Sequence, residues 1–352
     1  MTIHITSAHI ESWSTEIESR SLLPVFVRRL IHSTVDHANI VKIDFPGDAD
    51  TTSSRGYDGI LECKQTNGWV PEGISVWELS TSEGVERKAN EDYQKRTADP
   101  LKINPSTTTY IGVSTRKWNG KNDWKIARRQ ENIWRDVRFY DADDLAQWME
   151  TSPAISLWMG ERIGHHISIR GVSLLENHWP NVCRMVKDGI NISPELFTIS
   201  RQENVTALIS WLRNPPGDFP VKSDSDAAVL DFIAAVIESM DASEKEDYHS
   251  RALVLDQQVD WNMKFSIWGV LLFSLQSPLC LSVWSRTWYH RPCDIVTMFY
   301  EFRPNFMANP ECVCHDSTAM IYRPSLSEQD TRLLMPDKWP KKSVVRELIF
   351  EI

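Results

Sequence analysis

The chain has 352 residues, which at roughly 150 residues per domain predicts two domains and at least one core of full size. Hydrophobic residues make up 41% and charged residues 24%, with only 14 Gly and 18 Pro, so the collagen-like, disordered and linker-dominated classes are excluded. The 38 Lys and Arg against 48 Asp and Glu give a net charge of -10, which excludes a protein that coats nucleic acid over its whole surface.

The start of the chain and its cysteines indicate the compartment. The first residues, MTIHITSAHIESW, lack the basic start and the continuous apolar core of a secretory signal, so we expect a cytoplasmic protein. The most apolar later run, Phe265 to Trp284, is interrupted by Ser, Gln and Pro, whereas a membrane-spanning helix needs about 20 continuous apolar residues. We therefore expect no membrane segment. The 6 Cys are too few for a disulfide scaffold and are expected to be thiols.

The stretch from Ser7 to about Ile163 has the clearer periodicity. Apolar residues at helical spacing predict helices, and short apolar or β-branched runs between turn residues predict strands. Pro46-Gly47 and Asn67-Gly68 separate three of these strands, which predicts an antiparallel meander. The expected elements are helices over Ser7–Ile17 and Leu22–Ser33, strands over Ile40–Phe45, Tyr57–Cys63 and Ser75–Ser80, a helix over Glu83–Thr97, a buried strand over Thr107–Ser114, a helix over Lys121–Trp134, a strand over Val137–Tyr140 and a helix over Asp141–Met149.

The pattern weakens from His165 to about Pro194, and a second region follows. We therefore predict an α/β protein in which a domain over residues 1–165 has a mixed central sheet flanked by helices, and a second, smaller α/β domain of unknown role covers residues 166–352. In the second region the sequence predicts strands over Phe197–Ile199 and Ala252–Leu255, helices over Asn204–Leu212 and Ala227–Met240, and strand-like runs over Phe265–Phe273 and Leu279–Trp284.

Two acidic residues of the predicted meander are candidates for a metal site. Asp58 lies near the start of the second strand and Glu78 lies inside the third, so a hairpin of these strands would bring them together. Such a pair of carboxylates could hold Mg²⁺ or Mn²⁺, which activates water against a phosphodiester. The structural alternative is that Asp58 caps a turn and that Glu78 faces water.

A cation must also stabilise the charge that develops on the phosphoryl group, and Lys88 is the candidate. It lies in the predicted helix that follows Glu78, beside Arg87, and could extend back over the strand. The alternative is that Lys88 is a solvated partner of Glu91 or Asp92, three or four residues further along the helix.

The order of elements over roughly residues 8–150, with Asp58-Gly59 on the second strand and Val76-Trp77-Glu78 on the third, resembles the restriction-endonuclease fold of the PD-(D/E)xK nucleases. The resemblance implies a restriction-endonuclease-like sheet and a metal-dependent nuclease. More narrowly, four segments resemble the amino-terminal domain of long bacterial defence-type proteins, in which a larger carboxy-terminal region follows. These segments are WVPEGISVWELS (Trp69–Ser80), KANEDYQKRTADPL (Lys88–Leu101), TTTYIGVSTRKW (Thr107–Trp118) and YDADDLAQW (Tyr140–Trp148).

The resemblance assigns the metal-binding carboxylates to Asp58 and Glu78 but leaves the third motif position without a lysine. The motif lysine should follow Glu78 by two residues, where this chain has Ser80. In some members of the superfamily the next helix supplies the lysine, which here points to Lys88. Glu62-Cys63-Lys64 is a second literal match, but it lies four residues after Asp58 on the same expected strand, so we prefer Glu78. Because Glu62 shares the face of Asp58, it is an additional candidate for the metal site.

A basic segment in this acidic chain is the candidate nucleic-acid interface. Between Arg116 and Arg138 eight basic residues stand against three acidic ones, a local net charge of +5, and Trp118, Trp124 and Trp134 lie among them. Basic side chains would neutralise phosphates, and a tryptophan could stack on an unpaired base. The alternative is a solvated helix face with core tryptophans. The candidate DNA-binding residues are Arg116, Lys117, Lys121, Lys125, Arg128 and Arg129.

Other chemistries have weaker support. Cys312, Cys314 and His315, with His290 and Cys293 upstream, have zinc-binding residue types, but the C-x-C spacing is tighter than usual and no second matched pair follows, so we favour no zinc site. The chain has no P-loop, nucleophile-elbow or dinucleotide-binding motif.

The leading prediction is a metal-dependent endodeoxyribonuclease that acts on DNA in bacterial defence against foreign DNA. Its rival is a nuclease-fold DNA-binding or sensor module whose catalysis has decayed, as Ser80 in place of the lysine would permit. Cutting both strands of a duplex favours a homodimer. Since the chain lacks a recognisable NTPase, we also expect a separate NTPase or sensor partner.

Overall fold

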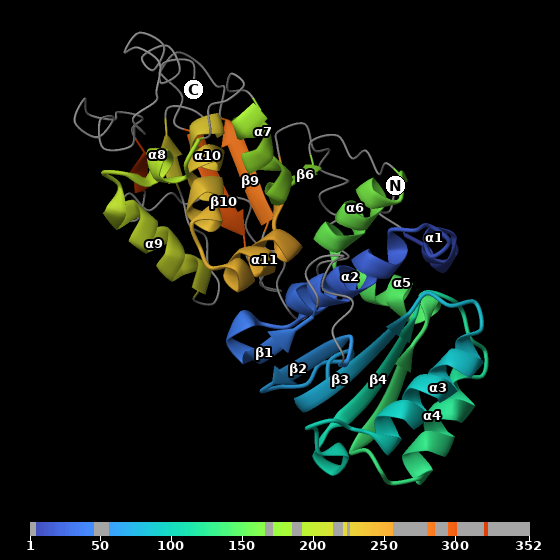
Figure 1. The fold of residues 1–352 in the computed structure, drawn as a ribbon. Helices are drawn as coiled ribbons and strands as arrows, with labels where there is room; N and C mark the ends of the chain where they lie inside the picture. Colours follow the sequence, from blue (N-terminus) through green and yellow to red (C-terminus); the bar gives the residue numbers. More distant parts are fainter. Residues whose placement is uncertain are drawn as a thin grey trace, which may run out of the picture. The chain divides into compact units, whose positions relative to one another are not determined.

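The computed structural model describes residues 5–45, 56–165, 172–184, 192–213, 221–223, 226–255, 280–285, 295–300 and 320–322. The chain divides into two compact units, and the first division lies after Ile167. Each unit has its own sheet and its own helices, so the expected α/β class is confirmed (Figure 1). No helix in these ranges combines the length and the apolar character that a bilayer crossing requires.

The first unit is built on a five-stranded mixed sheet in the order β1-β2-β3-β4-β5. The first and the third strand each pair antiparallel with the second, which confirms the predicted meander. The fourth strand lies parallel to the third and the fifth, because each connection contains a helix that returns the chain to the same end of the sheet. The strands are β1 (Ile40–Asp44), β2 (Gly59–Cys63), β3 (Gly73–Ser80), β4 (Thr109–Ser114) and β5 (Asp136–Tyr140).

Helices cover both faces of this sheet (Figure 1). They are α1 (Ser7–Trp13), α2 (Ser19–Thr34), α3 (Val85–Ala98), α4 (Lys121–Gln130), α5 (Ala142–Glu150) and α6 (Pro153–Arg162). α3 and α4 pack on one face, and α2 and α5 pack on the other. All residues of β4 are buried, as predicted for this strand, because a parallel strand in the middle of such a sheet is covered on both sides.

Aromatic side chains fill both layers of the first unit. Tyr93 of α3 meets Tyr110 of β4 edge-on, with ring centroids 5.3 Å apart. On the opposite face Trp77 of β3 packs against Trp148 of α5, with centroids 6.5 Å apart. Because side chains alternate along a strand, the next residue, Glu78, points toward α3.

Three helices of the first unit differ from the prediction. α4 ends at Gln130 rather than Trp134, because Asn132 has a positive φ of 53° and so leaves the helical conformation. α1 ends at Trp13 rather than Ile17, because the Ser14 hydroxyl donates a hydrogen bond to the carbonyl oxygen of Glu11 (2.6 Å) and so competes with the next helical turn. α6 was not predicted, although Pro153 at its first position is a known start signal. Since this helix is buried almost all round, its sequence lacks the amphipathic period by which a helix is recognised.

The second unit contains a six-stranded sheet in the order β11-β7-β10-β9-β8-β6. Among the described residues this sheet has one strand more than the sheet of the first unit. Its strands are β6 (Val172–Leu174), β7 (Val221–Ser223), β8 (Leu253–Leu255), β9 (Cys280–Ser285), β10 (Ile295–Tyr300) and β11 (Met320–Tyr322). Its helices are α7 (His178–Arg184), α8 (Glu195–Thr198), α9 (Gln202–Arg213), α10 (Asp226–Glu238) and α11 (Ala242–Arg251).

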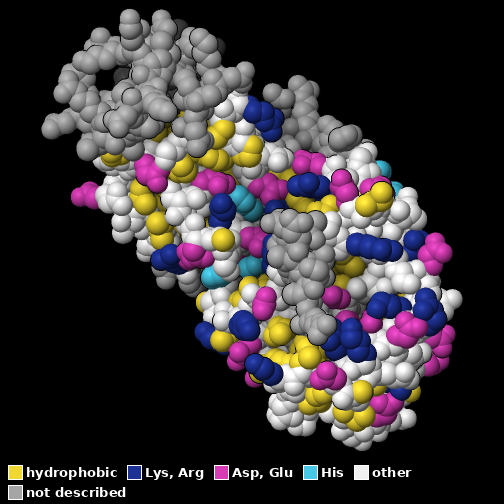
Figure 2. Space-filling view, in the orientation of Figure 1, with side chains coloured by type: hydrophobic (Ala, Val, Ile, Leu, Met, Phe, Trp, Pro, Cys, Tyr) yellow, Lys and Arg dark blue, Asp and Glu magenta, His cyan; other side chains and the backbone are white. Residues whose placement is uncertain are grey.

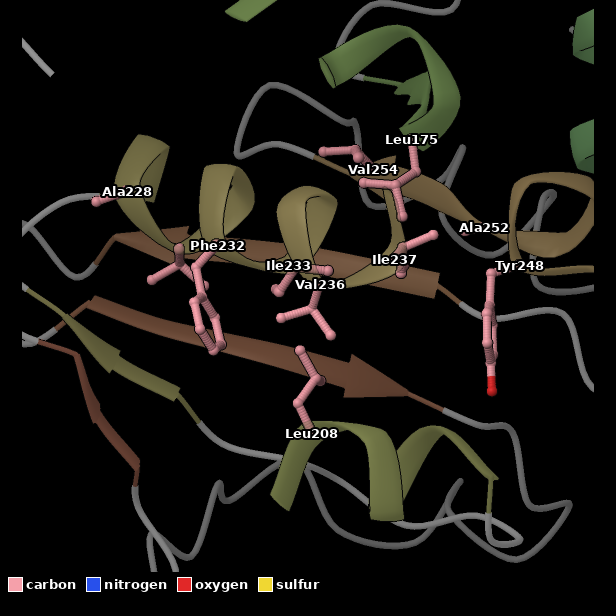
Figure 3. Close-up of a cluster of buried hydrophobic side chains, with 11 residues drawn as sticks. Leu175, Leu208, Ala228, Phe232, Ile233, Val236, Ile237, Tyr248, Ala252 and Val254 are labelled. Carbon is pink, nitrogen blue, oxygen red and sulfur yellow. The ribbon is translucent and has the colours of Figure 1, made fainter. Parts of the chain in front are cut away.

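α10 carries the core of the second unit. Its side chains Phe232 and Val236 belong to a buried cluster that includes Leu208 of α9 and Val254 of β8 (Figure 3). A helix with so many apolar residues must be covered by several neighbours. Its 13 residues exceed the usual length of a strand, so the apolar run predicts a helix.

The remaining predictions for the second region have mixed outcomes. The helices expected as α9 and α10 and the strands expected as β8 and β9 are confirmed. The strand predicted over Phe197–Ile199 is wrong, because Glu195–Thr198 forms a helical turn after Pro194, and a run this short does not distinguish the two structures. The run Phe265–Phe273 lies outside the described residues, as does the cysteine and histidine group Cys312, Cys314, His315, His290 and Cys293.

Candidate functional site

Asp58 and Glu78 lie opposite one another where β2 and β3 pair. In this antiparallel pair Gly59 is the register partner of Trp77. Asp58 directly precedes the first of these and Glu78 directly follows the second. Oδ2 of Asp58 accepts a hydrogen bond from the backbone N–H of Leu79, 2.7 Å away. The meander thus brings the two predicted carboxylates together.

Glu78 is buried and Asp58 is half-buried. Glu78 is only 7% exposed, and burial together with the charge of Asp58 raises its pKa to about 7. Burial also raises the pKa of Asp58, although the hydrogen bond from Leu79 acts in the opposite direction. A negative charge is therefore poorly solvated here, and a positive group is needed to stabilise it.

Helix α3 presents three charged residues to these carboxylates. Lys88, Asp92 and Arg96 are spaced by four residues, which places them on one face of the helix. Nζ of Lys88 lies 2.6 Å from Oδ1 of Asp92. Burial and the hydrogen bond from Leu79 have the largest effects on the pKa of Asp58. The charges of Asp92, Arg96 and Lys88 have smaller effects on it, so these three side chains lie close to Asp58.

Arg96 makes the direct contact with Glu78. Its Nε–H donates a hydrogen bond to Oε1 of Glu78, and its Nη2 donates to the carbonyl oxygen of Gly56. The guanidinium carbon lies 4.6 Å from the centroid of the Tyr57 ring. Burial lowers the pKa of Arg96, but the contact with Glu78 more than offsets this, so the guanidinium remains charged.

A small pocket opens between α3 and the carboxyl ends of β3 and β4. Its lining includes Glu78 and Ser80 from β3, Lys88 and Asp92 from α3, and Ser114 from β4. The carboxyl ends of parallel strands are the usual place for ligands in open α/β sheets. Of the charged residues described above, Glu78, Lys88 and Asp92 line the pocket, whereas Asp58 and Arg96 do not.

The structure brings the predicted catalytic residues Asp58, Glu78 and Lys88 into one neighbourhood. The alternative expected for Lys88 is also present, since it pairs with Asp92, but the pair is partly buried rather than solvated. The sequence did not predict Asp92 and Arg96 as members of the site. They lie four and eight residues after Lys88, and this helical spacing would have placed all three side chains on one face of α3.

Glu62 does not join the site. It pairs with Ile74 and lies four residues from Asp58, which corresponds to about 13 Å along a strand. One ion with ligands at about 2.1 Å cannot contact both carboxylates at that distance. Ser80 lines the pocket, and its hydroxyl accepts a hydrogen bond from the backbone N–H of Ser82 (3.1 Å), so it offers a polar atom but no charge.

The basic segment is largely neutralised by acidic residues, several of which lie outside it. Nζ of Lys121 lies 2.6 Å from Oδ1 of Asp141 and 2.6 Å from Oδ2 of Asp144, which ties α4 to the start of α5. The local charge of +5 therefore overstates the positive potential that a phosphate would meet. Five of the six predicted DNA-binding residues take part in ion pairs: Arg116 with Glu83, Lys117 with Asp143, Lys121 with Asp141 and Asp144, Arg128 with Glu131, and Arg129 with Asp136.

Two of the three tryptophans in this segment are core residues. Trp124 and Trp134 are buried, and their indole N–H groups donate hydrogen bonds to Asn90 (2.9 Å) and Thr97 (3.0 Å). The idea that these two rings stack on a base is therefore wrong, because the rings are packed and their donors are satisfied. Trp118 is half-buried.

Lys125 is the remaining predicted DNA-binding residue. Within the described part of the chain it has no ion-pair partner, and burial lowers its pKa. On the face of the first unit drawn in Figure 2, basic and acidic side chains are interspersed rather than gathered into a continuous basic surface. Binding of DNA by this segment stays a prediction.

Oxygen donors of the kind that a hard divalent cation prefers lie in the pocket lining and beside it. Carboxylate oxygens of Asp58 and Glu78 are the ligands that Mg²⁺ and Mn²⁺ prefer, and no Cys or His lines this pocket to favour zinc. No protein-family model, curated protein or solved structure matches the chain. The class is therefore defined by the fold and the site alone: an α/β protein with a five-stranded mixed sheet, flanked by helices, and a cluster of buried charges between β3 and α3.

Proposed function

We propose that the first unit is a restriction-endonuclease-like domain that hydrolyses phosphodiester bonds of DNA with Mg²⁺ or Mn²⁺, in bacterial defence against foreign DNA. The observation that carries the proposal is the position of Asp58, just before β2, opposite Glu78 of β3. The resemblance of the same segments to PD-(D/E)xK nucleases agrees with it. An antiparallel meander followed by a helical crossover to a parallel strand supports the same fold.

Asp58, Glu78 and Lys88 each have a role in such a reaction. Asp58 and Glu78 hold the cation, which supplies a Lewis acid and lowers the pKa of bound water. Lys88, 38% exposed at the pocket, stabilises the negative charge that develops on the phosphoryl oxygens. Because Lys88 pairs with Asp92, this role requires its ammonium group to exchange a carboxylate for a phosphate.

The residue at the third motif position favours a second function. Ser80 stands where the motif has its lysine, and both cations near the site, Lys88 and Arg96, are paired with acidic side chains. These features support a catalytically decayed DNA-binding or sensor module, which binds DNA without cutting it.

Incubation of the purified chain with nucleic acid distinguishes the two functions. Supercoiled, linear and single-stranded DNA, and a matched RNA, are each incubated with Mg²⁺, with Mn²⁺ and with EDTA. The nuclease proposal expects cleavage of DNA with either metal and none in EDTA. Retention of intact DNA under all three conditions favours the decayed module.

Lys121→Gln and Lys125→Gln are expected to have different signatures. Loss of Lys121 removes the partner of Asp141 and Asp144 and should lower the free energy of unfolding by about 1–2 kcal/mol. Loss of Lys125 should change stability by less than about 0.5 kcal/mol and reduce the slope of log affinity for DNA against log salt by about one unit. Urea unfolding and fluorescence anisotropy measure the two effects. Parent-like DNA affinity of the Lys125 variant at every salt concentration would remove α4 from the interface.

The proposal extends to partners. A homodimer would place one site on each strand of a duplex, and a separate NTPase or sensor protein would control it. The second unit would then serve as an accessory domain.

A further inference from the structure

Arg96 holds Glu78 through a contact that is anchored at three points. The guanidinium donates to Glu78, donates to the carbonyl oxygen of Gly56, and lies over the ring of Tyr57. Both Arg96 and Glu78 are buried, so the ion pair is shielded from solvent and is stronger than a surface pair. The contact is thus part of the folded structure rather than a transient surface pair.

The charges of the site nearly balance without a metal ion. Asp58, Glu78 and Asp92 are three acidic groups, and Lys88 and Arg96 are two basic ones. A divalent cation on Glu78 would therefore share its carboxylate with a guanidinium in a poorly solvated place. Since like charges repel strongly where water is excluded, the two cations compete.

We propose that Arg96 is a resident counter-ion that must release Glu78 before a divalent cation binds there, so that this guanidinium limits the metal affinity of the site. The inference rests on the proposed metal-dependent function and adds to it a residue that no motif position predicts. Gly56 and Tyr57 directly precede Asp58. Release of Arg96 therefore also frees the backbone that leads into the second carboxylate.

Titration of the full chain with Mn²⁺ alone, in the absence of DNA, tests the inference. Isothermal titration calorimetry compares the parent with Arg96→Gln, Arg96→Lys and Arg87→Gln. Arg87 is the matched control, because it lies on the same helix, is 70% exposed and pairs with Glu91 (2.9 Å) instead of Glu78. Arg96→Gln should bind Mn²⁺ at least tenfold more tightly than the parent, Arg96→Lys should bind more tightly by a smaller factor, and Arg87→Gln should match the parent. Adding Glu78→Gln to Arg96→Gln should abolish the gain.

The possible results separate this inference from the proposed function. Parent-like or weaker Mn²⁺ binding by a natively folded Arg96→Gln overturns the resident counter-ion, whereas binding by the parent still supports a metal site. No Mn²⁺ binding by the parent or by any variant overturns both. If circular dichroism shows that Arg96→Gln does not fold, Arg96→Lys decides: tighter binding than the parent supports the inference, and unchanged binding overturns it.

Discussion

Replacement of Glu78 by Gln is expected to reduce Mg²⁺-dependent cleavage of DNA by about 100-fold or more. The amide keeps the shape of the side chain, and its oxygen can still accept the hydrogen bond from Arg96, but the charge that holds the cation is gone. DNA binding should survive, because it depends on contacts with the phosphate backbone elsewhere. Initial rates of plasmid cleavage and gel-shift titrations measure the two quantities.

Two further variants make this result specific to the site. Lys88→Met should lower the rate about tenfold, because it removes the ammonium group nearest the pocket, and the loss should be smaller if Arg87 substitutes. Glu91→Gln is the matched control, since Glu91 lies on the same helix and pairs with the exposed Arg87. If the parent cuts DNA and neither Glu78→Gln nor Lys88→Met slows it, the active site lies elsewhere in the chain.

The stability of the first unit is expected to fall as the pH rises from about 4.5 to about 7. Burial and the charge of Asp58 raise the pKa of Glu78 from 4.5 to about 7, so in this range the folded chain keeps a proton that the unfolded chain has lost. The contribution is fully present below pH 4.5 and is lost as the pH rises through 7, by about 3 kcal/mol for a shift of this size. The raised pKa of Asp58 acts in the same direction. Urea unfolding in metal-free buffers between pH 4.5 and 8 measures the effect.

Comparison with Glu78→Gln isolates this contribution. The pKa of His9 is lowered by burial, which acts in the opposite direction, and such contributions cancel in the difference between parent and variant. The variant should lack most of the decrease. Addition of Mn²⁺ at pH 8 should stabilise the parent and leave the variant unchanged, because only the folded parent binds the ion. A difference between parent and variant that stays constant from pH 4.5 to 8 would mean that Glu78 titrates alike in the folded and unfolded chains.

The meander, the buried strand β4 and the pairing of Asp58 with Glu78 follow from patterns in the sequence. β2 and β3 are consecutive in the chain, and the segment between them, which contains Asn67-Gly68, holds no crossover helix, so the two strands pair antiparallel. Alternation along a strand then sets which residues share a face. These features depend on local patterns, and local patterns are visible in one sequence.

Which charges act together depends on how the helices pack on the sheet. Arg96 reaches Glu78 over 18 positions, and Lys121 reaches Asp141 over 20. Helical spacing indicates that residues of α3 share a face, but packing of that face on the sheet brings Arg96 to the carboxylate of Glu78. The basic segment shows the same dependence on packing. Its local charge of +5 is correct for the segment, but several of the acidic residues that pair with it lie outside the segment. The free energy of a charge depends on its solvation and its neighbours in space, and neither is encoded in the spacing of residues along one segment.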